Sequence, residues 1–68
     1  MNWDTIAGNW QQYVGKARER WGRITKDEMD VIQGRRDQLE GKIREVYGKE
    51  RDEAEREVDE FCRECADD

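Results

Sequence analysis

The sequence predicts an all-α fold, and three observations support this assignment. Apolar residues recur at steps of three and four along most of the chain, which is the spacing of one helical face. The chain contains no proline and no stretch in which apolar and polar residues alternate as in a strand. One segment is repeated, and both copies carry the helical spacing. With 68 residues, the chain is long enough for one small domain.

The repeat is marked by the glycines, which fall in two triplets with seven-residue steps and an offset of 26 residues between them. Segments 8–22 and 34–48 carry the same residue at seven of fifteen aligned positions. Two copies are too few for an extended repeat array, so we expect them to pack on each other within one domain. The triplets are Gly8, Gly15 and Gly22, and Gly34, Gly41 and Gly48.

The first helix is expected over residues 3–21, with a break near Gly8. Asn2 is a suitable N-cap, and Gly22 is a suitable residue to follow the last helical turn. The apolar stripe that predicts this helix consists of Trp3, Ile6, Trp10, Tyr13 and Ala17 and continues beyond the helix to Ile24, with Val14 and Trp21 beside it.

Further helical segments follow in order. Thr25 and Glu28 have the spacing of a capping box, which predicts the start of a helix that ends or bends at Gly34. The helical spacing resumes as far as Gly48, which is expected to terminate that helix, and again from about residue 51 to 65. The apolar residues of these three segments are Met29, Val31 and Ile32, then Leu39, Ile43, Val46 and Tyr47, and finally Ala54, Val58, Phe61 and Cys65.

The same spacing places all six glycines on the side of the helices opposite the apolar stripe. Two of them are explained as helix ends, and Gly8 and Gly34 are expected to be tolerated bends or boundaries. Gly15 and Gly41 lie inside expected helices, where each costs about 1 kcal/mol relative to alanine. Two interpretations remain open for these two glycines: a tolerated weakness of the helix, or bare backbone that another helix or a partner chain approaches closely.

Charge is unevenly distributed along the chain. Of 68 residues, 46% are charged and the net charge is −5, yet residues 1–48 carry +1 and residues 49–68 carry −6. Nucleic-acid binding is disfavoured, because the acidic segment could fold over the modest basic cluster and neutralise it. No apolar run approaches the roughly 20 residues of a membrane span. The N-terminus has no basic region followed by an apolar stretch, so we expect no signal peptide, no membrane partner and a cytoplasmic location.

The residues needed for catalysis are largely missing. The chain has no histidine and no glycine-rich phosphate loop, and its carboxylates have the spacing of a solvated surface. We therefore expect no enzyme, no cofactor and no metal site.

Cys62 and Cys65 form the one conspicuous chemical pair. Two cysteines supply only half of a zinc site, and the end of an acidic helix does not favour a thiolate. We expect one of them to cap the edge of the core and the other to be incidental. The expected state is a monomer, and the alternative is adventitious oxidation or a dimer cross-linked through Cys62 or Cys65.

Three stretches of the sequence resemble the CsbD-like family of small bacterial stress-response proteins over about residues 1–61. They are MNWDTIAGNW, DVIQGRRDQLEGKIRE and VYGKERDEAEREVDEF. The resemblance implies a bundle of about four helices, arranged as two helical hairpins packed crosswise, and induction under general stress with no established biochemical activity. It implies no catalytic or ligand residues. The chain departs from the family pattern at Lys49-Glu50-Arg51 and at its Phe61–Cys65 ending. We expect a single domain over residues 1–65 and a disordered acidic end at 66–68.

Two hypotheses for function follow from this reading. The first is a non-enzymatic, stress-induced protein that acts as a highly soluble hydrophilic protectant. The alternative is a small interaction module that binds a protein or nucleic acid through a basic helix face. The sequence does not identify the partner. The residues expected on that face are Gly15, Lys16, Arg18, Arg20, Arg23, Gly41, Lys42 and Arg44.

Overall fold

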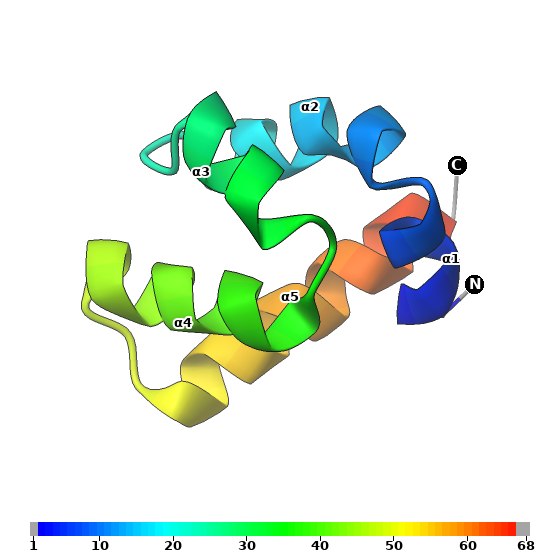
Figure 1. Ribbon diagram of the computed structural model, residues 1–68. Coiled ribbons are helices and arrows are strands. Elements are labelled where there is room, and N and C mark those ends of the chain that lie inside the picture. The colour runs from blue at the N-terminus through cyan, green and yellow to red at the C-terminus, as the bar shows by residue number, and fades with distance from the viewer. Residues whose placement is uncertain (1, 67–68) are drawn as a thin grey trace.

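The computed structural model describes residues 2–66, and all of its regular structure is helical (Figure 1). The prediction of an all-α fold is therefore confirmed. Within residues 2–66 five helices are present where about four were expected, because the helix expected over 3–21 is divided in two near Gly8. They are α1 (Trp3–Gly8), α2 (Trp10–Arg20), α3 (Lys26–Ile32), α4 (Arg36–Tyr47) and α5 (Arg51–Ala66).

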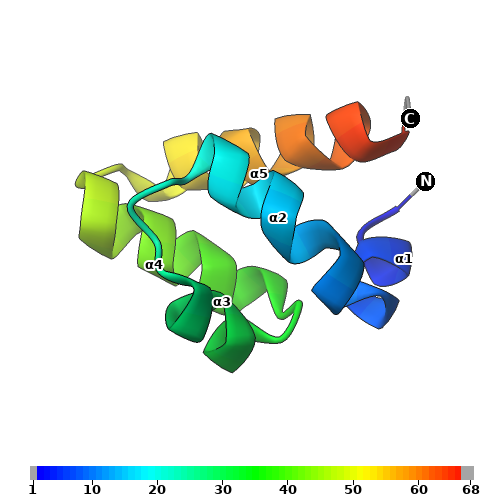
Figure 2. The same ribbon diagram turned by 90° about the horizontal axis from the view of Figure 1, so that it is seen from above.

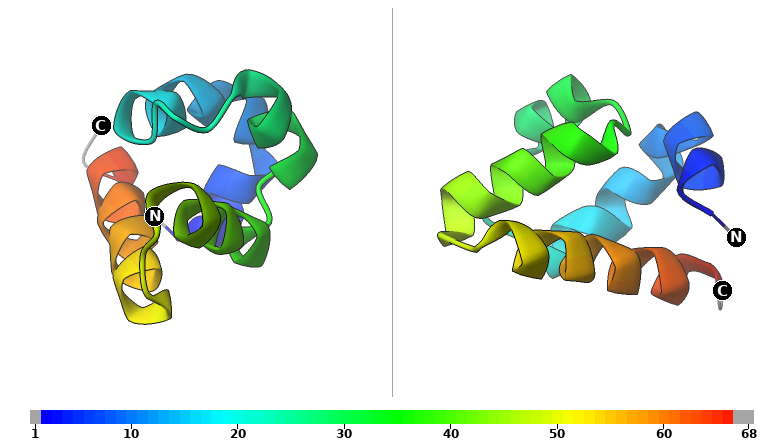
Figure 3. Two further views of the ribbon diagram at one scale, coloured as in Figure 1. Left: turned by 90° about the vertical axis from the view of Figure 1, so that its left-hand side faces the viewer. Right: turned by 90° about the horizontal axis from the view of Figure 1, so that it is seen from below.

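The helices form two layers. In Figure 1, α2 and α3 lie above α4 and α5, and the short segment 48–50 joins α4 and α5 into a hairpin. Helix α2 runs obliquely over the lower pair when seen from above (Figure 2), and the views in Figure 3 show the two layers from the side and from below. Helix α5 continues to Ala66, the first residue of the expected disordered end. Residues 67 and 68 of that end lie outside the described residues.

Local sequence signals set most of the helix boundaries. The side chain of Asn2 accepts a hydrogen bond from the backbone N–H of Thr5 at 3.2 Å and caps α1. Thr25 and Glu28 form the predicted capping box at the start of α3. Gly48 ends α4 in the left-handed conformation, as predicted. Gly22 follows the end of α2 without adopting a positive φ, so its glycine character is not needed there.

Gly34 differs from its prediction. It is buried rather than opposite the core, and α3 ends two residues earlier, with Gln33 and Gly34 both in the left-handed region. A Cβ atom on Gly34 would lie 2.8 Å from the Cα of Ala7, and the carbonyl oxygen of Gly34 accepts a hydrogen bond from the indole of Trp3 at 2.8 Å. The interpretation of Gly34 as a merely tolerated bend or boundary is therefore wrong, because the close approach of α1 requires glycine there.

The core lies between the two layers and includes Trp10 and Trp21, and the partly buried Trp3 packs against it. The ring centroids of Trp3 and Phe61 are 6.4 Å apart, and those of Trp21 and Phe61 are 5.2 Å apart, so one phenylalanine of α5 contacts both ends of the α1–α2 segment. Val31, expected among the apolar residues of α3, is 75% exposed. The buried core residues are Ile6, Trp10, Val14, Ala17, Trp21, Ile24, Met29, Ile32, Leu39, Ile43, Ala54, Val58, Phe61 and Cys65.

The two glycines Gly8 and Gly34 provide a paired test of this packing, because only Gly34 has a neighbour that an added Cβ would meet. Gly34→Ala should lower the free energy of unfolding by about 2 kcal/mol or more, because a positive φ and a contact with Ala7 both oppose a side chain. Gly8→Ala should change it by less than about 1 kcal/mol, since nothing lies within 4 Å of the added Cβ. Urea unfolding of both variants measures the difference, and equal effects would contradict the packing described.

Candidate interaction face

Arg20, at the end of α2, is bound to α5. Its guanidinium donates to Glu60 at 2.7 Å and to Glu64 at 2.8 Å, and its carbon lies 5.6 Å from the ring centroid of Trp21. The sequence predicted that the acidic end of the chain could fold over the basic cluster, and these two ion pairs are contacts of that kind. Arg20 therefore joins α2 to α5 and has little capacity left for an outside partner.

Arg23, in the segment between α2 and α3, contacts the end of α4. Its backbone N–H donates to the hydroxyl of Tyr47 at 3.0 Å, and its guanidinium carbon lies 6.0 Å from the Tyr47 ring centroid. This pair attaches the 21–25 segment to the lower layer.

Lys42, on α4, pairs with the capping box of α3. Its Nζ lies 2.9 Å from Glu28 Oε2 and 3.7 Å from Glu45. The backbone N–H of Thr25 donates to Glu28 at 3.0 Å. This hydrogen bond, followed by those from Lys42 and the Thr25 hydroxyl, lowers the pKa of Glu28 from its ordinary 4.5 to about 2. The hydrogen bond to Glu28 also raises the pKa of Lys42.

The remaining predicted residues present an open surface. Gly15 and Gly41 lie in the middle of α2 and α4, both are exposed, and a Cβ on either would meet nothing within 4 Å. Arg18 and Arg44 are exposed and form no ion pair with another residue of the described range 2–66. Three of the predicted cations are thus engaged with α3, α4 and α5, whereas two cations and two glycines face solvent.

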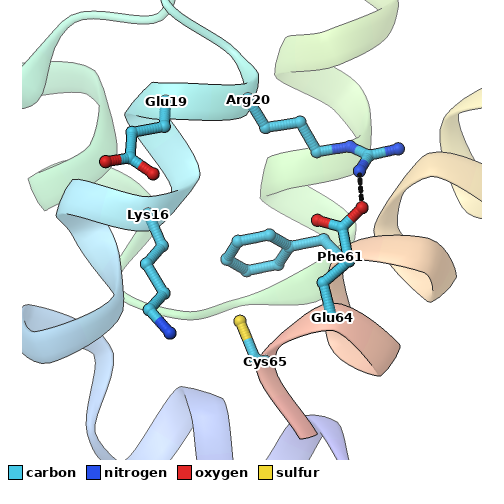
Figure 4. Close-up of a pocket in the computed structure, with 6 residues that line it drawn as sticks. All are labelled: Lys16, Glu19, Arg20, Phe61, Glu64 and Cys65. Atoms are coloured by element: carbon cyan, nitrogen blue, oxygen red, sulfur yellow. Dashed lines mark hydrogen bonds and ion pairs between the residues drawn. The ribbon is translucent and has the colours of Figure 1, made fainter. Parts of the chain in front are cut away.

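Lys16 lines a groove that the sequence did not reveal. A cavity of about 430 Å³ lies between α2 and α5 and is walled by Lys16, Glu19, Arg20, Phe61, Glu64 and Cys65 (Figure 4). In this view the Lys16 side chain and the Cys65 thiol point into the same space, with the Phe61 ring beside them. The pairing of α2 with α5 could not be read from helical spacing. The opposite charges of the two segments were its only signal.

The chemistry available in this groove is limited. Burial raises the pKa of the Cys65 thiol, and the charge of Lys16 offsets this only in part, so Cys65 is a poor nucleophile. Within residues 2–66, no group of three or more potential ligands is placed to hold a metal ion. No helix of the same range is sufficiently long and apolar to cross a membrane.

Comparison with known proteins identifies the family. Residues 4–56 match the family model described as CsbD-like. The chain belongs to the CsbD-like family. Its relatives include the UPF0337 protein RPA4217 of Rhodopseudomonas palustris, which is 49% identical over 32 residues that make up 47% of this chain and 48% of the relative. The UPF0337 protein YjbJ of Escherichia coli K12 is 55% identical over 32 residues, or 47% of this chain and 46% of the relative.

These matches are partial and carry no stated activity. The chain spans about half the length of the curated relatives it matches, including the UPF0337 protein Atu4724 of Agrobacterium fabrum, which is 50% identical over 32 residues (47% of this chain and 48% of the relative). No solved structure matches this CsbD-like chain significantly.

The Glu28–Lys42 pair gives a test by pH. Because the folded-state pKa of Glu28 is depressed, its contribution to stability is present above pH 4.5 and is lost as pH falls towards about 2. Glu28→Gln keeps the side-chain acceptor of the capping box but removes the charge. The variant should be less stable than the parent at pH 6, and the difference should shrink between pH 4.5 and about 2.

Urea unfolding across this pH range measures the effect. Glu45→Gln is the matched control, because Glu45 is also paired with Lys42 but at 3.7 Å and on an exposed side chain. A difference in the free energy of unfolding between Glu28→Gln and the parent that stays constant from pH 6 to pH 2 would contradict the lowered pKa of Glu28.

Proposed function

We propose that this CsbD-like chain is a non-enzymatic stress-response protein that acts in the cytoplasm as a hydrophilic protectant. The observation that supports it most is the nature of the surface. No charged or polar side chain is buried within the described residues, and Val31 is the one large apolar side chain among them that is exposed. The molecule therefore presents a nearly continuous layer of charged and polar groups around a small core.

Such a surface suits a protein that must remain soluble at high concentration. Charges of both signs are interspersed, and several form ion pairs between neighbouring side chains, such as Arg51–Glu55 on α5. The scarcity of exposed apolar area removes the usual route to self-association. Water bound by this layer would protect client proteins without a specific binding site. The protein would also separate unfolding client proteins from one another and so reduce the contacts between them.

A protection assay tests this proposal. A heat-labile enzyme is heated or dried with the protein or with an equal mass of ribonuclease A, and its residual activity is measured. More residual activity is expected with this protein than with ribonuclease A. Protection no better than that of ribonuclease A would remove the proposal.

A variant with four exposed charges neutralised tests whether the charged surface is responsible for protection. Arg18→Gln, Arg44→Gln, Glu19→Gln and Asp37→Asn together leave the net charge unchanged, and no ion pair involving these residues contributes to the contacts described above. Protection should decrease in this variant while its circular dichroism stays that of the parent. Undiminished protection would show that the charged surface is not responsible.

The alternative function, a small interaction module, is favoured by one specific observation. Gly15 and Gly41 weaken two helices where no contact within the fold requires glycine. We infer that they occupy corresponding positions of an internal repeat, each followed by the sequence Lys-apolar-Arg-Glu. Bare helix backbone beside an exposed arginine, Arg18 or Arg44, is a surface that a protein or nucleic-acid partner could approach closely.

Two sets of variants test this alternative. Gly15→Ala and Gly41→Ala should each raise the free energy of unfolding by about 0.5–1 kcal/mol, which urea unfolding measures. If Gly15 and Gly41 allow a partner to approach the helix backbone closely, the double variant Gly15→Ala with Gly41→Ala should bind that partner less well, although it is more stable than the parent. Arg18→Glu with Arg44→Glu should abolish salt-sensitive binding to mixed-sequence DNA in a shift assay, or to proteins captured from stressed cells. Unchanged binding by both sets of variants would exclude this face.

A further inference from the structure

Cys62 and Cys65 lie on consecutive turns of α5, close to its C-terminal end. The Cys62 side chain is half-buried, whereas Cys65 is buried at the edge of the core, and both are thiols. Residues three apart on a helix are neighbours on one face. Neither the protectant function nor the alternative interaction face uses this pair.

The groove between α2 and α5 gives small molecules access to Cys65, the more buried of the two thiols. The Cys65 thiol lines the 430 Å³ cavity and faces the Lys16 side chain across it (Figure 4). A cavity of this size admits a molecule as small as hydrogen peroxide. The positive charge of Lys16 also favours the thiolate form of Cys65, against the effect of burial.

The helical geometry permits a bond but opposes it mildly. Neighbouring Cβ atoms on a helix face are about 5–6 Å apart, whereas a disulfide requires about 3.5–4.5 Å. Closing the bond therefore requires the chain to tighten by roughly 1–2 Å. The last turn of α5, which contains Cys65, can adjust in this way because the final carbonyl groups of a helix have no helical partner.

We propose that Cys62 and Cys65 are an oxidation site, at which hydrogen peroxide produces a reversible disulfide within α5. The Cys62 thiolate, the more exposed of the two, attacks one peroxide oxygen. The O–O bond breaks, and the released hydroxide takes up the thiol proton as water, leaving Cys62 as a sulfenic acid. The Cys65 sulfur then attacks the Cys62 sulfur, the S–O bond breaks, and a second water leaves with the Cys65 proton. Two thiols lose two electrons in total, and one peroxide gains them.

Bond formation alters the contact between α2 and α5. Glu64 lies between the two cysteines in the chain and holds Arg20 at 2.8 Å, and Cys65 contributes to the core beside Phe61. Drawing Cys65 towards Cys62 displaces the Glu64 carboxylate from Arg20 and the Cys65 side chain from the core. The oxidised protein should therefore unfold at a lower urea concentration than the reduced protein, and its strained disulfide should be reduced readily by dithiothreitol.

The test is to treat the folded protein with hydrogen peroxide and to measure its mass and alkylatable thiols. The expected result is a monomer that has lost about 2 Da and both alkylatable thiols, reversed by dithiothreitol. Cys62→Ser and Cys65→Ala, each checked for folding by circular dichroism, should show no such loss. A disulfide-linked dimer, a stable gain of oxygen, or unchanged thiols in the folded parent would overturn the proposal.

A second measurement separates oxidation of the folded protein from oxidation of the unfolded chain. The stabilised variant Gly15→Ala with Gly41→Ala has both cysteines and an unchanged groove. Its disulfide should form at the same rate as in the parent. A rate reduced about fivefold or more, in proportion to the lower population of unfolded chain, would show that the unfolded chain is the species oxidised and would overturn the proposal.

Discussion

The helices of this chain are held to one another through the indole N–H groups of three tryptophans, each of which donates to a distant part of the chain. Trp3 donates to the carbonyl of Gly34, Trp10 to the carbonyl of Met29 at 2.8 Å, and Trp21 to Glu57 of α5 at 3.2 Å. Only 34% of the residues are hydrophobic, so large aromatic side chains must supply much of the buried area. Each indole buries a broad apolar surface and still satisfies its polar group, which fixes the helix that it meets.

The other unusual features of the fold follow from this arrangement. Because Trp3 reaches the carbonyl of Gly34, Ala7 is brought against that residue, which can then have no side chain. Because the core is assembled from a few large groups, the charged side chains remain outside it and pair with one another across helix boundaries. Arg36 is an example: it joins α4 to α5 through Asp59 at 2.6 Å. A small aromatic core and a charged surface are therefore two aspects of one composition.

Helical spacing and capping chemistry were sufficient to predict the elements but not their contacts. The Thr25–Glu28 capping box and the termination at Gly48 are local, and the sequence predicted both. The burial of Gly34 and the exposure of Val31 depend on which helix lies opposite, which a periodic pattern does not specify. The same limit applied to the candidate face: the sequence predicted one basic helix face, yet Arg20 and Lys42 are paired with acids of α5 and α3. The groove beside Cys65 could not be predicted either, because the sequence pattern does not specify that α2 lies against α5.

Hydrogen exchange of the three indole N–H groups, followed by NMR, tests the central claim most directly. Each indole gives a separate signal, so the bonds to Gly34, Met29 and Glu57 are reported individually. The account predicts that all three exchange slowly and that Trp10 exchanges at the rate of the most protected core amides, which open only on global unfolding. Exchange of these indoles as fast as in an exposed tryptophan, while the core amides stay protected, would contradict the claim that they hold the helices together.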